Sequence, residues 1–146
     1  MNQNTTAGRS DVFGPLIEAT CEMVDVPPAT VWAESAPAGC RVATFRVMDT
    51  ECVLSHRSVM ADRLFIHCGF GPMPVARTAD ALMALLQLNL VMYMGNSPAF
   101  AMDPDRNVLL CMELRLAELD ASTLVQTLED LAVQASGWRK AWLDHE

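Results

Sequence analysis

The sequence has few basic residues. Its 146 residues include 10 lysines and arginines against 18 aspartates and glutamates, which gives a formal net charge of −8. Nucleic-acid binding depends on clustered basic side chains that neutralise phosphates, and an anionic membrane surface attracts the same side chains. The acidic balance therefore argues against both partners. It suits a soluble protein, or one whose client is basic.

The sequence also lacks a long apolar run. The longest, residues 81–94, is interrupted by Gln87 and Asn89, whereas a membrane-spanning helix needs about 20 predominantly apolar residues. The polar start of the chain, residues 1–9, contains no apolar segment of the kind found in secretory signals. We therefore expect no membrane span, no visible secretory signal and a cytoplasmic protein.

Paired cysteine motifs are absent as well. The five cysteines are an odd number, none is arranged as Cys-x-x-Cys, and each lies in or beside an apolar run. Reduced thiols in the core of a cytoplasmic protein are the simplest interpretation. These residues are Cys21, Cys40, Cys52, Cys68 and Cys111.

What the chain does contain is enough apolar sequence for one folded domain. Apolar residues make up 51% of the sequence, and a domain of about 150 residues buries roughly 68–70% of its unfolded surface without a disulfide or a metal. Residues 1–9 are polar and show no periodicity, so we expect a disordered tail. Residues 10–146 are then a single domain.

Periodicity and turn residues predict the order α-β-β-β-α-β-β-α, an α+β fold with a twisted antiparallel sheet packed by helices. A proline-rich connector, residues 25–39, follows the first helix and includes a candidate short strand at Val31-Trp32. The first expected helix begins at Asp11 or Gly14 and ends at Met23, the second spans residues 78–94, and the third begins after Asp120 or Ser122 and ends at Leu143. The expected strands are 40–48, 51–59, 63–69, 100–102 and 108–116.

The middle helix has more apolar surface than one sheet can cover. At 100° per residue, its leucines and methionines nearly encircle the helix axis. An apolar surface on all sides must be covered on all sides, and few elements remain in the chain to do so. A second copy across a two-fold axis is the economical solution. The alternative is a central helix wrapped by its own chain.

The two outer helices differ from the middle one. The last helix has one clean apolar stripe and is expected to pack once, on the sheet. The first helix is short and lies between Pro15 and Pro27, and isolated helices of that length are only marginally stable. It is either a lightly docked element beside a partner-binding groove or an ordinary covering helix.

Catalytic and metal-binding patterns are weak. His67 and Cys68 are adjacent and point to opposite faces of a strand, and Cys52 and His56 are too far apart along a strand to share one metal. Cys68 with His56 across strands is a possible nucleophile pair, but a buried thiol is the stronger interpretation. We expect no enzyme, no metal and no cofactor.

The second half of the chain carries a recognisable succession of pieces. Leu85-Leu86-Gln87-Leu88-Asn89-Leu90 is followed by Gly95, a turn at residues 103–107, a strand at 108–116 and a last helix with Ala135 and Trp138. This succession resembles the class I type III secretion chaperones of the Tir chaperone (CesT) family. The first half matches in layout only.

The resemblance implies a homodimer in the bacterial cytoplasm that binds the N-terminal region of a secreted effector and keeps it soluble and export-competent. It implies no nucleotide hydrolysis. The residues it assigns to the dimer interface are Leu82, Leu85, Leu86, Asn89, Leu90, Tyr93, Phe100 and Met102. Those it assigns to effector binding, on the outer sheet and first helix, are Phe13, Leu16, Ile17, Val42, Phe45 and Val53.

Two other functions stay open at this point. One is a homodimeric protein-binding scaffold or regulator of the same fold without a secreted client. The other is a small-molecule-binding enzyme with a pocket between the sheet and the first helix.

Overall fold

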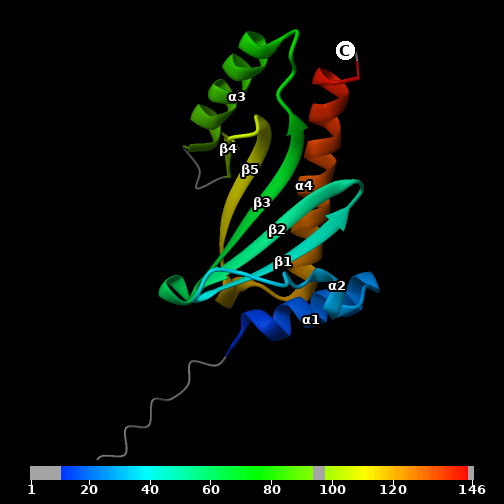
Figure 1. Cartoon of the computed structure of the whole chain (residues 1–146), viewed down its shortest axis with the longest axis vertical. Coiled ribbons are helices and arrows are strands. Elements are labelled where there is room, and N and C mark those ends of the chain that lie inside the picture. Colours follow the sequence, from blue (N-terminus) through cyan, green and yellow to red (C-terminus); the bar gives the residue numbers. More distant parts are fainter. Residues whose placement is uncertain (1–10, 94–97, 145–146) are drawn as a thin grey trace, which may run out of the picture.

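The computed structural model describes residues 11–93 and 98–144, and it shows the α+β arrangement that the sequence predicts (Figure 1). The expected tail at residues 1–9 and the end of the helix expected over residues 78–94 lie outside the described residues. The helices are α1 Phe13–Val24, α2 Pro28–Val31, α3 Thr78–Tyr93 and α4 Ala121–Trp142; the strands are β1 Cys40–Val47, β2 Thr50–Arg57, β3 Arg63–Pro72, β4 Ala99–Met102 and β5 Asn107–Arg115.

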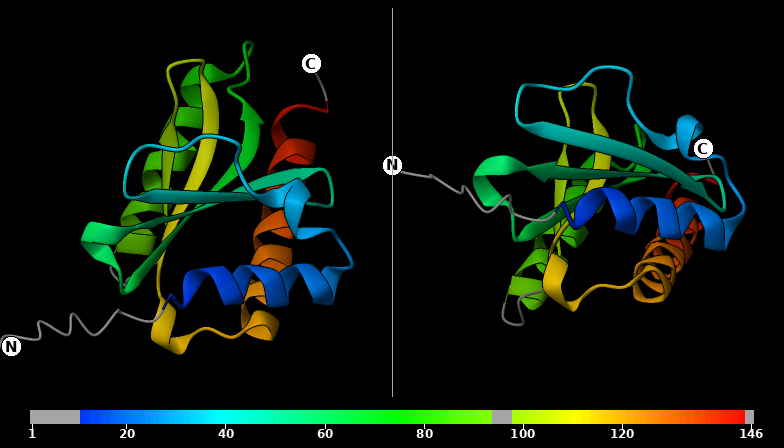
Figure 2. Two further views of the ribbon diagram at one scale, coloured as in Figure 1. Left: turned by 60° about the horizontal axis from the view of Figure 1, so that its bottom comes forward. Right: turned by 90° about the horizontal axis from the view of Figure 1, so that it is seen from below.

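The five strands form one antiparallel sheet in the order β1-β2-β3-β5-β4. β1 to β3 form an antiparallel meander, and the β4–β5 hairpin adds to β3 through β5. Helices α1 and α4 cross each other on one face of the sheet (Figure 2). The core lies between these helices and the inward side chains of the strands, including Phe45, Leu54, Ile66 and Leu110.

A two-residue turn at Met48 and Asp49 connects β1 to β2. Both residues have positive φ, 49° and 59°, which is the backbone of the tight hairpin turn whose twist matches that of the strands. Val47 faces Thr50 directly across the turn, and Arg46 faces Glu51. The turn thereby fixes which β1 side chains enter the core: Ala43 and Phe45 are buried and Arg46 is exposed.

Helix α4 agrees with its predicted single stripe. The Asp120 side chain accepts a hydrogen bond of 2.7 Å from the Thr123 N–H and so caps the first turn. Gly137 does not interrupt the helix. The stripe consists of Leu124, Leu128, Leu131, Ala135 and Trp138, which are all buried, and Trp142, which is half-buried.

Helix α1 is an integral part of the core. The Asp11 side chain accepts a hydrogen bond from the Gly14 N–H at 3.1 Å, and Phe13 and Ile17 are fully buried. The description of α1 as a lightly docked element is therefore wrong, because its apolar face is enclosed between the sheet and α4. The covering-helix alternative is correct.

The connector and β3 also differ from prediction. Instead of a strand at Val31-Trp32, residues Pro28–Val31 form the short helix α2, which begins with a proline whose fixed φ suits a first helical turn. Trp32 then makes a single bridge to Ala43. β3 extends to Pro72 because a bulge between Gly69 and Gly71 allows pairing with β5 to continue.

Helix α3 stands beside the sheet and makes its principal contact with β4 (Figure 1). Only Ala81 and Leu85 of this helix are buried. Its own chain therefore covers one narrow side, and the alternative of a central helix wrapped by its own chain is wrong for the described residues. None of the helices formed by residues 11–93 and 98–144 is both long and apolar enough to cross a membrane.

Candidate functional site

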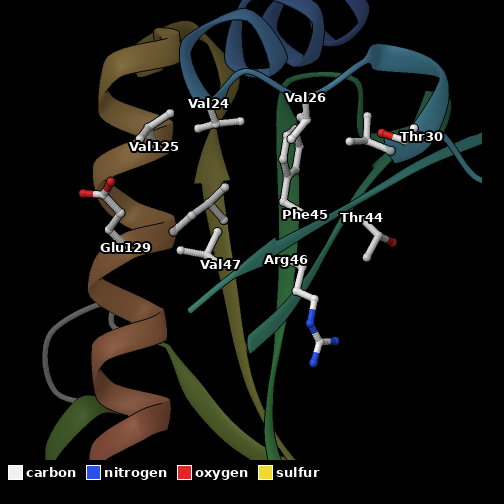
Figure 3. Close-up of a pocket in the computed structure, with 11 residues that line it drawn as sticks. Val24, Val26, Thr30, Thr44, Phe45, Arg46, Val47, Val125 and Glu129 are labelled. Atoms are coloured by element: carbon white, nitrogen blue, oxygen red, sulfur yellow. The ribbon is translucent and has the colours of Figure 1, made fainter. Parts of the chain in front are cut away.

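A cavity of about 280 Å³ lies where the outer edge of β1 meets helices α1, α2 and α4 (Figure 3). We call it the edge groove. Most of its lining is apolar, and Arg46 and Glu129 contribute charged groups from opposite sides. The lining residues are Val24, Val26, Thr30, Val31, Thr44, Phe45, Arg46, Val47, Val125, Leu128 and Glu129.

The backbone of β1 faces this groove with groups that can pair with another strand. The Ala33 N–H donates to the Val42 C=O at 2.9 Å, which shows that the polar groups of Val42 point away from β2. Alternate residues of a strand direct these groups to the same side, so Arg46 also directs its N–H and C=O outward. Contact with the connector stops at Ala43, and the edge beyond it borders the cavity.

The second notable surface is the uncovered side of α3. We call it the α3 surface and define it by its large exposed side chains. The exposed fraction is 67% for Leu86, 66% for Leu90 and 86% for Tyr93. Large exposed apolar side chains gathered on one helix typically mark a contact with another protein. Its members are Leu82, Met83, Leu86, Leu88, Leu90, Val91 and Tyr93.

The residues predicted for a dimer interface divide into two groups. Leu82, Leu86, Leu90 and Tyr93 belong to the α3 surface, and Met102 is exposed on β4. The remaining three are engaged within the chain: Leu85 is buried, Phe100 packs edge-on against Phe70 at 5.2 Å, and Asn89 bonds to β4.

The side chain of Asn89 is paired with the backbone of Phe100. Its Oδ1 accepts from the Phe100 N–H at 2.7 Å, and its Nδ2 donates to the Phe100 C=O at 3.1 Å. Asn89 therefore joins α3 to the outer edge of β4, a role that its place in the Leu-rich helix did not reveal.

The six residues predicted for effector binding do not form one surface. Phe13, Leu16, Ile17 and Phe45 are buried in the core, so they offer almost no area to a partner, although Phe45 lines the edge groove. Val42 and Val53 are half-buried on the opposite face of the sheet.

Sequence reasoning missed the α-helical wall of the groove. Val24 and Val26 come from the end of α1, and Val125 and Glu129 come from α4. The available signal was the pair of apolar residues around Asp25, whose φ of 56° ends α1 in a left-handed turn. That turn aims the chain back toward β1.

Arg41 connects α1, the connector and the sheet. Its Nη1 lies 2.7 Å from Asp11 Oδ2, and its guanidinium carbon lies 4.4 Å from the ring centroid of Trp32. The hydrogen bond from the Gly14 N–H, together with Arg41, holds the pKa of Asp11 below its ordinary value. These contacts fix the end of β1 that is remote from the edge groove.

The thiols do not form the nucleophile pair considered from the sequence. Cys68 faces Cys52 across β2 and β3, with their sulfur atoms 3.7 Å apart, whereas the His56 ring stacks on Phe13 and its Nε2 lies 2.9 Å from the Ala61 C=O. The hydrogen bond to Cys68 and burial both raise the pKa of Cys52. The Cys68–His56 pairing is therefore wrong, because the strand register places another thiol opposite Cys68.

Burial also raises the pKa of Cys21 and Cys111, which disfavours their thiolates. All five cysteines are free thiols in the structure. In the described part of the chain, no three histidine, cysteine, aspartate or glutamate side chains are grouped so that they could hold a metal ion.

A family model for the Tir chaperone protein (CesT) family matches residues 36–139, well over half of the chain. The chain belongs to this family. The match confirms the resemblance carried by the second half of the chain as far as residue 139, and extends it across strands β1 to β3. It also confirms the expected function of a type III secretion chaperone. No curated protein matches the sequence.

Solved structures share the fold at low sequence identity. A chain of the ExsC–ExsE complex superposes with a TM-score of 0.67 at 15% identity, covering 88% of this chaperone and 91% of that chain. A chain of the HopA1–SchA chaperone–effector complex gives 0.66 at 15%, covering 88% and 94%. The Yersinia pestis type III secretion chaperone SycH, in complex with a fragment of YscM2, gives 0.61 at 18%, covering 85% and 97%.

Proposed function

We propose that this chaperone binds an extended segment of a secreted effector by adding it as a strand to the outer edge of β1. The observation that carries the proposal is the open backbone edge at Arg46 beside the apolar edge groove. The edge supplies hydrogen bonds that do not depend on sequence, and the groove supplies a pocket for a side chain.

The geometry determines where the side chains of such a segment would lie. Side chains of an added strand point alternately to the two faces of the sheet. Those on the helix side would enter the edge groove between Val26 and Val125, where apolar contact is favoured (Figure 3). Those on the other side would extend the surface that contains Val42 and Val53. The proposal keeps these two valines as contact residues and adds the groove residues to them.

The names of the solved structures support a protein as the binding partner. Three of the chains that share the fold come from complexes with a second protein, named as an effector in the HopA1–SchA structure. Holding a segment in this way requires no bond to be made or broken, so the proposed activity includes no catalytic step and no cofactor. We place it in the bacterial cytoplasm, before export of the client.

We further propose that the working unit is a homodimer joined through the α3 surface. The exposed side chains on α3 belong to a helix with only two buried residues, so most of its apolar surface meets water in a single chain. Burial of apolar surface yields about 25 cal/mol per Å². A self-complementary contact of this helix with its copy would remove that surface from water on both chains at once.

Co-expression with the secreted proteins of the same organism tests the function directly. Affinity purification of the chaperone should retain one of them, and limited proteolysis should leave a protected segment that mass spectrometry can identify. Hydrogen exchange should then show the Arg46 amide slowed by this segment. Purification of the chaperone without any secreted protein, or a bound segment that leaves the Arg46 amide unchanged, would contradict the proposal.

A further inference from the structure

Two of the buried thiols lie directly opposite each other inside the sheet. Cys52 on β2 and Cys68 on β3 are paired in the strand register, and both side chains are fully buried. The Cys52 thiol donates a hydrogen bond to the Cys68 sulfur at 3.7 Å. No other cysteine of the described residues is hydrogen-bonded to a second thiol. Strand addition at β1 makes no use of this pair, so its chemistry is a separate question.

The backbone hydrogen bonds place the two thiols where their strands approach closely. The Val42 C=O points outward from β1, so Phe45, at an alternate position, bonds to β2 and faces Cys52 there. The polar backbone groups of Cys52 therefore point to β1, and Cys52 and Cys68 are a non-hydrogen-bonded pair of β2 and β3. The Cα atoms of such a pair are about 4.5 Å apart, within the range of about 4.4–6.8 Å that a disulfide spans.

A half-buried arginine lies beside the pair. Arg139 of α4 donates to the Thr50 hydroxyl at 2.9 Å and to the Gly69 C=O at 3.5 Å. The hydrogen bond from Cys52 lowers the pKa of Cys68 against the opposite effect of burial, and the charge of Arg139 lowers it further. The same hydrogen bond and burial raise the pKa of Cys52. Cys68 is therefore the thiol that ionises first, and the thiolate is the nucleophile.

We infer that Cys52 and Cys68 form an oxidation site for hydrogen peroxide, at which Cys68 attacks the peroxide and Cys52 completes a cross-strand disulfide. The Cys68 sulfur bonds to one peroxide oxygen, the O–O bond breaks, and the departing oxygen takes up a proton and leaves as water. The Cys52 sulfur then displaces the hydroxyl group of the resulting sulfenic acid, and the Cys52 proton leaves with that hydroxyl group as a second water. Two thiols are oxidised to one disulfide, and the peroxide is reduced to two waters.

Burial determines which product forms. Both sulfur atoms are closed to bulk water, so the small peroxide molecule reaches Cys68 when this part of the sheet opens locally. Cys52 is already in contact with the sulfenic acid once it has formed, whereas a second peroxide must wait for another opening. The reversible disulfide is therefore favoured over the irreversible sulfinic acid. Transient, redox-sensing disulfides of this kind are the ones that occur in cytosolic proteins.

The test treats the reduced full-length protein with hydrogen peroxide, alkylates the remaining thiols with N-ethylmaleimide in urea, and maps tryptic peptides by mass spectrometry without reduction. Cleavage after arginine places Cys52 in the peptide 47–57 and Cys68 in the peptide 64–77. These peptides should appear linked, lighter than their sum by two hydrogen atoms, and dithiothreitol should separate them. Cys111→Ala removes a half-buried thiol from the opposite face of the sheet and should give the same linked pair.

Two substitutions separate the roles of the two thiols. Cys52→Ala leaves Cys68 without its partner, so the peptide 64–77 should gain oxygen, which fragment spectra place on Cys68 and not on Met73. Cys68→Ala should leave Cys52 as a thiol that N-ethylmaleimide still alkylates. Alanine keeps both positions apolar, and circular dichroism checks that the variants fold. If neither folds, the linked pair in the unchanged protein and in Cys111→Ala still decides the outcome.

The inference is overturned if Cys52 and Cys68 both remain open to alkylation at a peroxide concentration that oxidises the half-buried Cys40 and Cys111. Equal oxidation of the remaining thiol in Cys52→Ala and Cys68→Ala would contradict the assignment of Cys68 as the attacking group. Neither result bears on the proposed chaperone function, because no cysteine lines the edge groove.

Discussion

The guanidinium carbon of Arg41 lies over the ring of Trp32, 4.4 Å from its centroid, and Arg41 Nη1 lies 2.7 Å from Asp11 Oδ2. One side chain thereby joins the start of α1, the proline-rich connector and β1. A planar guanidinium can stack on a ring and bond at its edge at the same time, and an ammonium cannot.

Arg41→Lys is therefore expected to destabilise the fold although it keeps the charge. The ion pair is about half exposed on both sides, so most of the loss comes from the stacking contact, in total about 1 kcal/mol in the free energy of unfolding. Urea unfolding followed by tryptophan fluorescence measures it. Arg46→Lys, on the exposed part of the same strand, is the matched control. Equal losses in the two variants would refute the assigned role of Arg41.

Leu86→Asp should convert the proposed dimer into a monomer. The side chain is 67% exposed and lies outside the core of its own chain, so the fold should survive while a charge enters the contact between copies. Light scattering should give about twice 16.0 kDa for the unchanged protein and 16.0 kDa for the variant. Val59→Asp, at another exposed apolar position, should remain dimeric. A monomeric unchanged protein would disprove the interface outright.

Arg46→Pro should abolish client binding without unfolding the protein. The Arg46 N–H points away from β2, so a proline there removes a donor from the open edge and leaves the β1–β2 hydrogen bonds in place. We expect affinity for the protected effector segment to fall by at least about tenfold, measured by titration calorimetry. Arg46→Ala keeps the N–H and separates the backbone effect from that of the charge. Similar weakening in both variants would rule out strand addition at this residue.

Asp120 should make stability depend on acid pH. The Thr123 N–H, and then the Thr123 side chain, lower the pKa of Asp120 below its ordinary value of 3.8. A carboxylate with a lowered pKa contributes its stability above the unfolded value, and that contribution is lost as the pH falls through the folded value, below 3.8. Asp120→Asn keeps a capping oxygen that does not titrate. The urea midpoint of this variant should therefore fall less between about pH 5 and pH 2.5 than that of the unchanged protein. The lowered pKa of Asp120 sets this pH window. Parallel curves would exclude Asp120 as a contributor.

Elements with strong periodicity and clear turn residues could be predicted from the sequence. The stripe of α4, the order of the strands and the apolar excess of α3 all follow from residue spacing, because local geometry fixes which side chains share a face. The effector site was harder. Phe13 and Phe45 belong to apolar patterns that look the same whether they face a core or a partner, and only the packing of α4 on α1 shows that they are enclosed.

The contacts between distant segments were beyond sequence reasoning for a different reason. Asn89 and Phe100 come together through the placement of a helix beside a strand edge, and Arg41 meets Trp32 through a connector whose proline content indicates only that it is irregular. Neither pair leaves a signal in spacing, because each contact depends on where whole elements come to rest.

The turn at Met48 and Asp49 determines which residues of β1 hydrogen-bond to β2 and which direct their backbone groups outward. With two residues in the turn, odd-numbered positions of β1 bond to β2 and even-numbered positions bond outward. One residue inserted at this turn would exchange the two sets and move every side chain of β1 to the opposite face. Phe45 would then leave the core and Arg46 would enter it. A turn of two residues thus decides which amides the strand can offer.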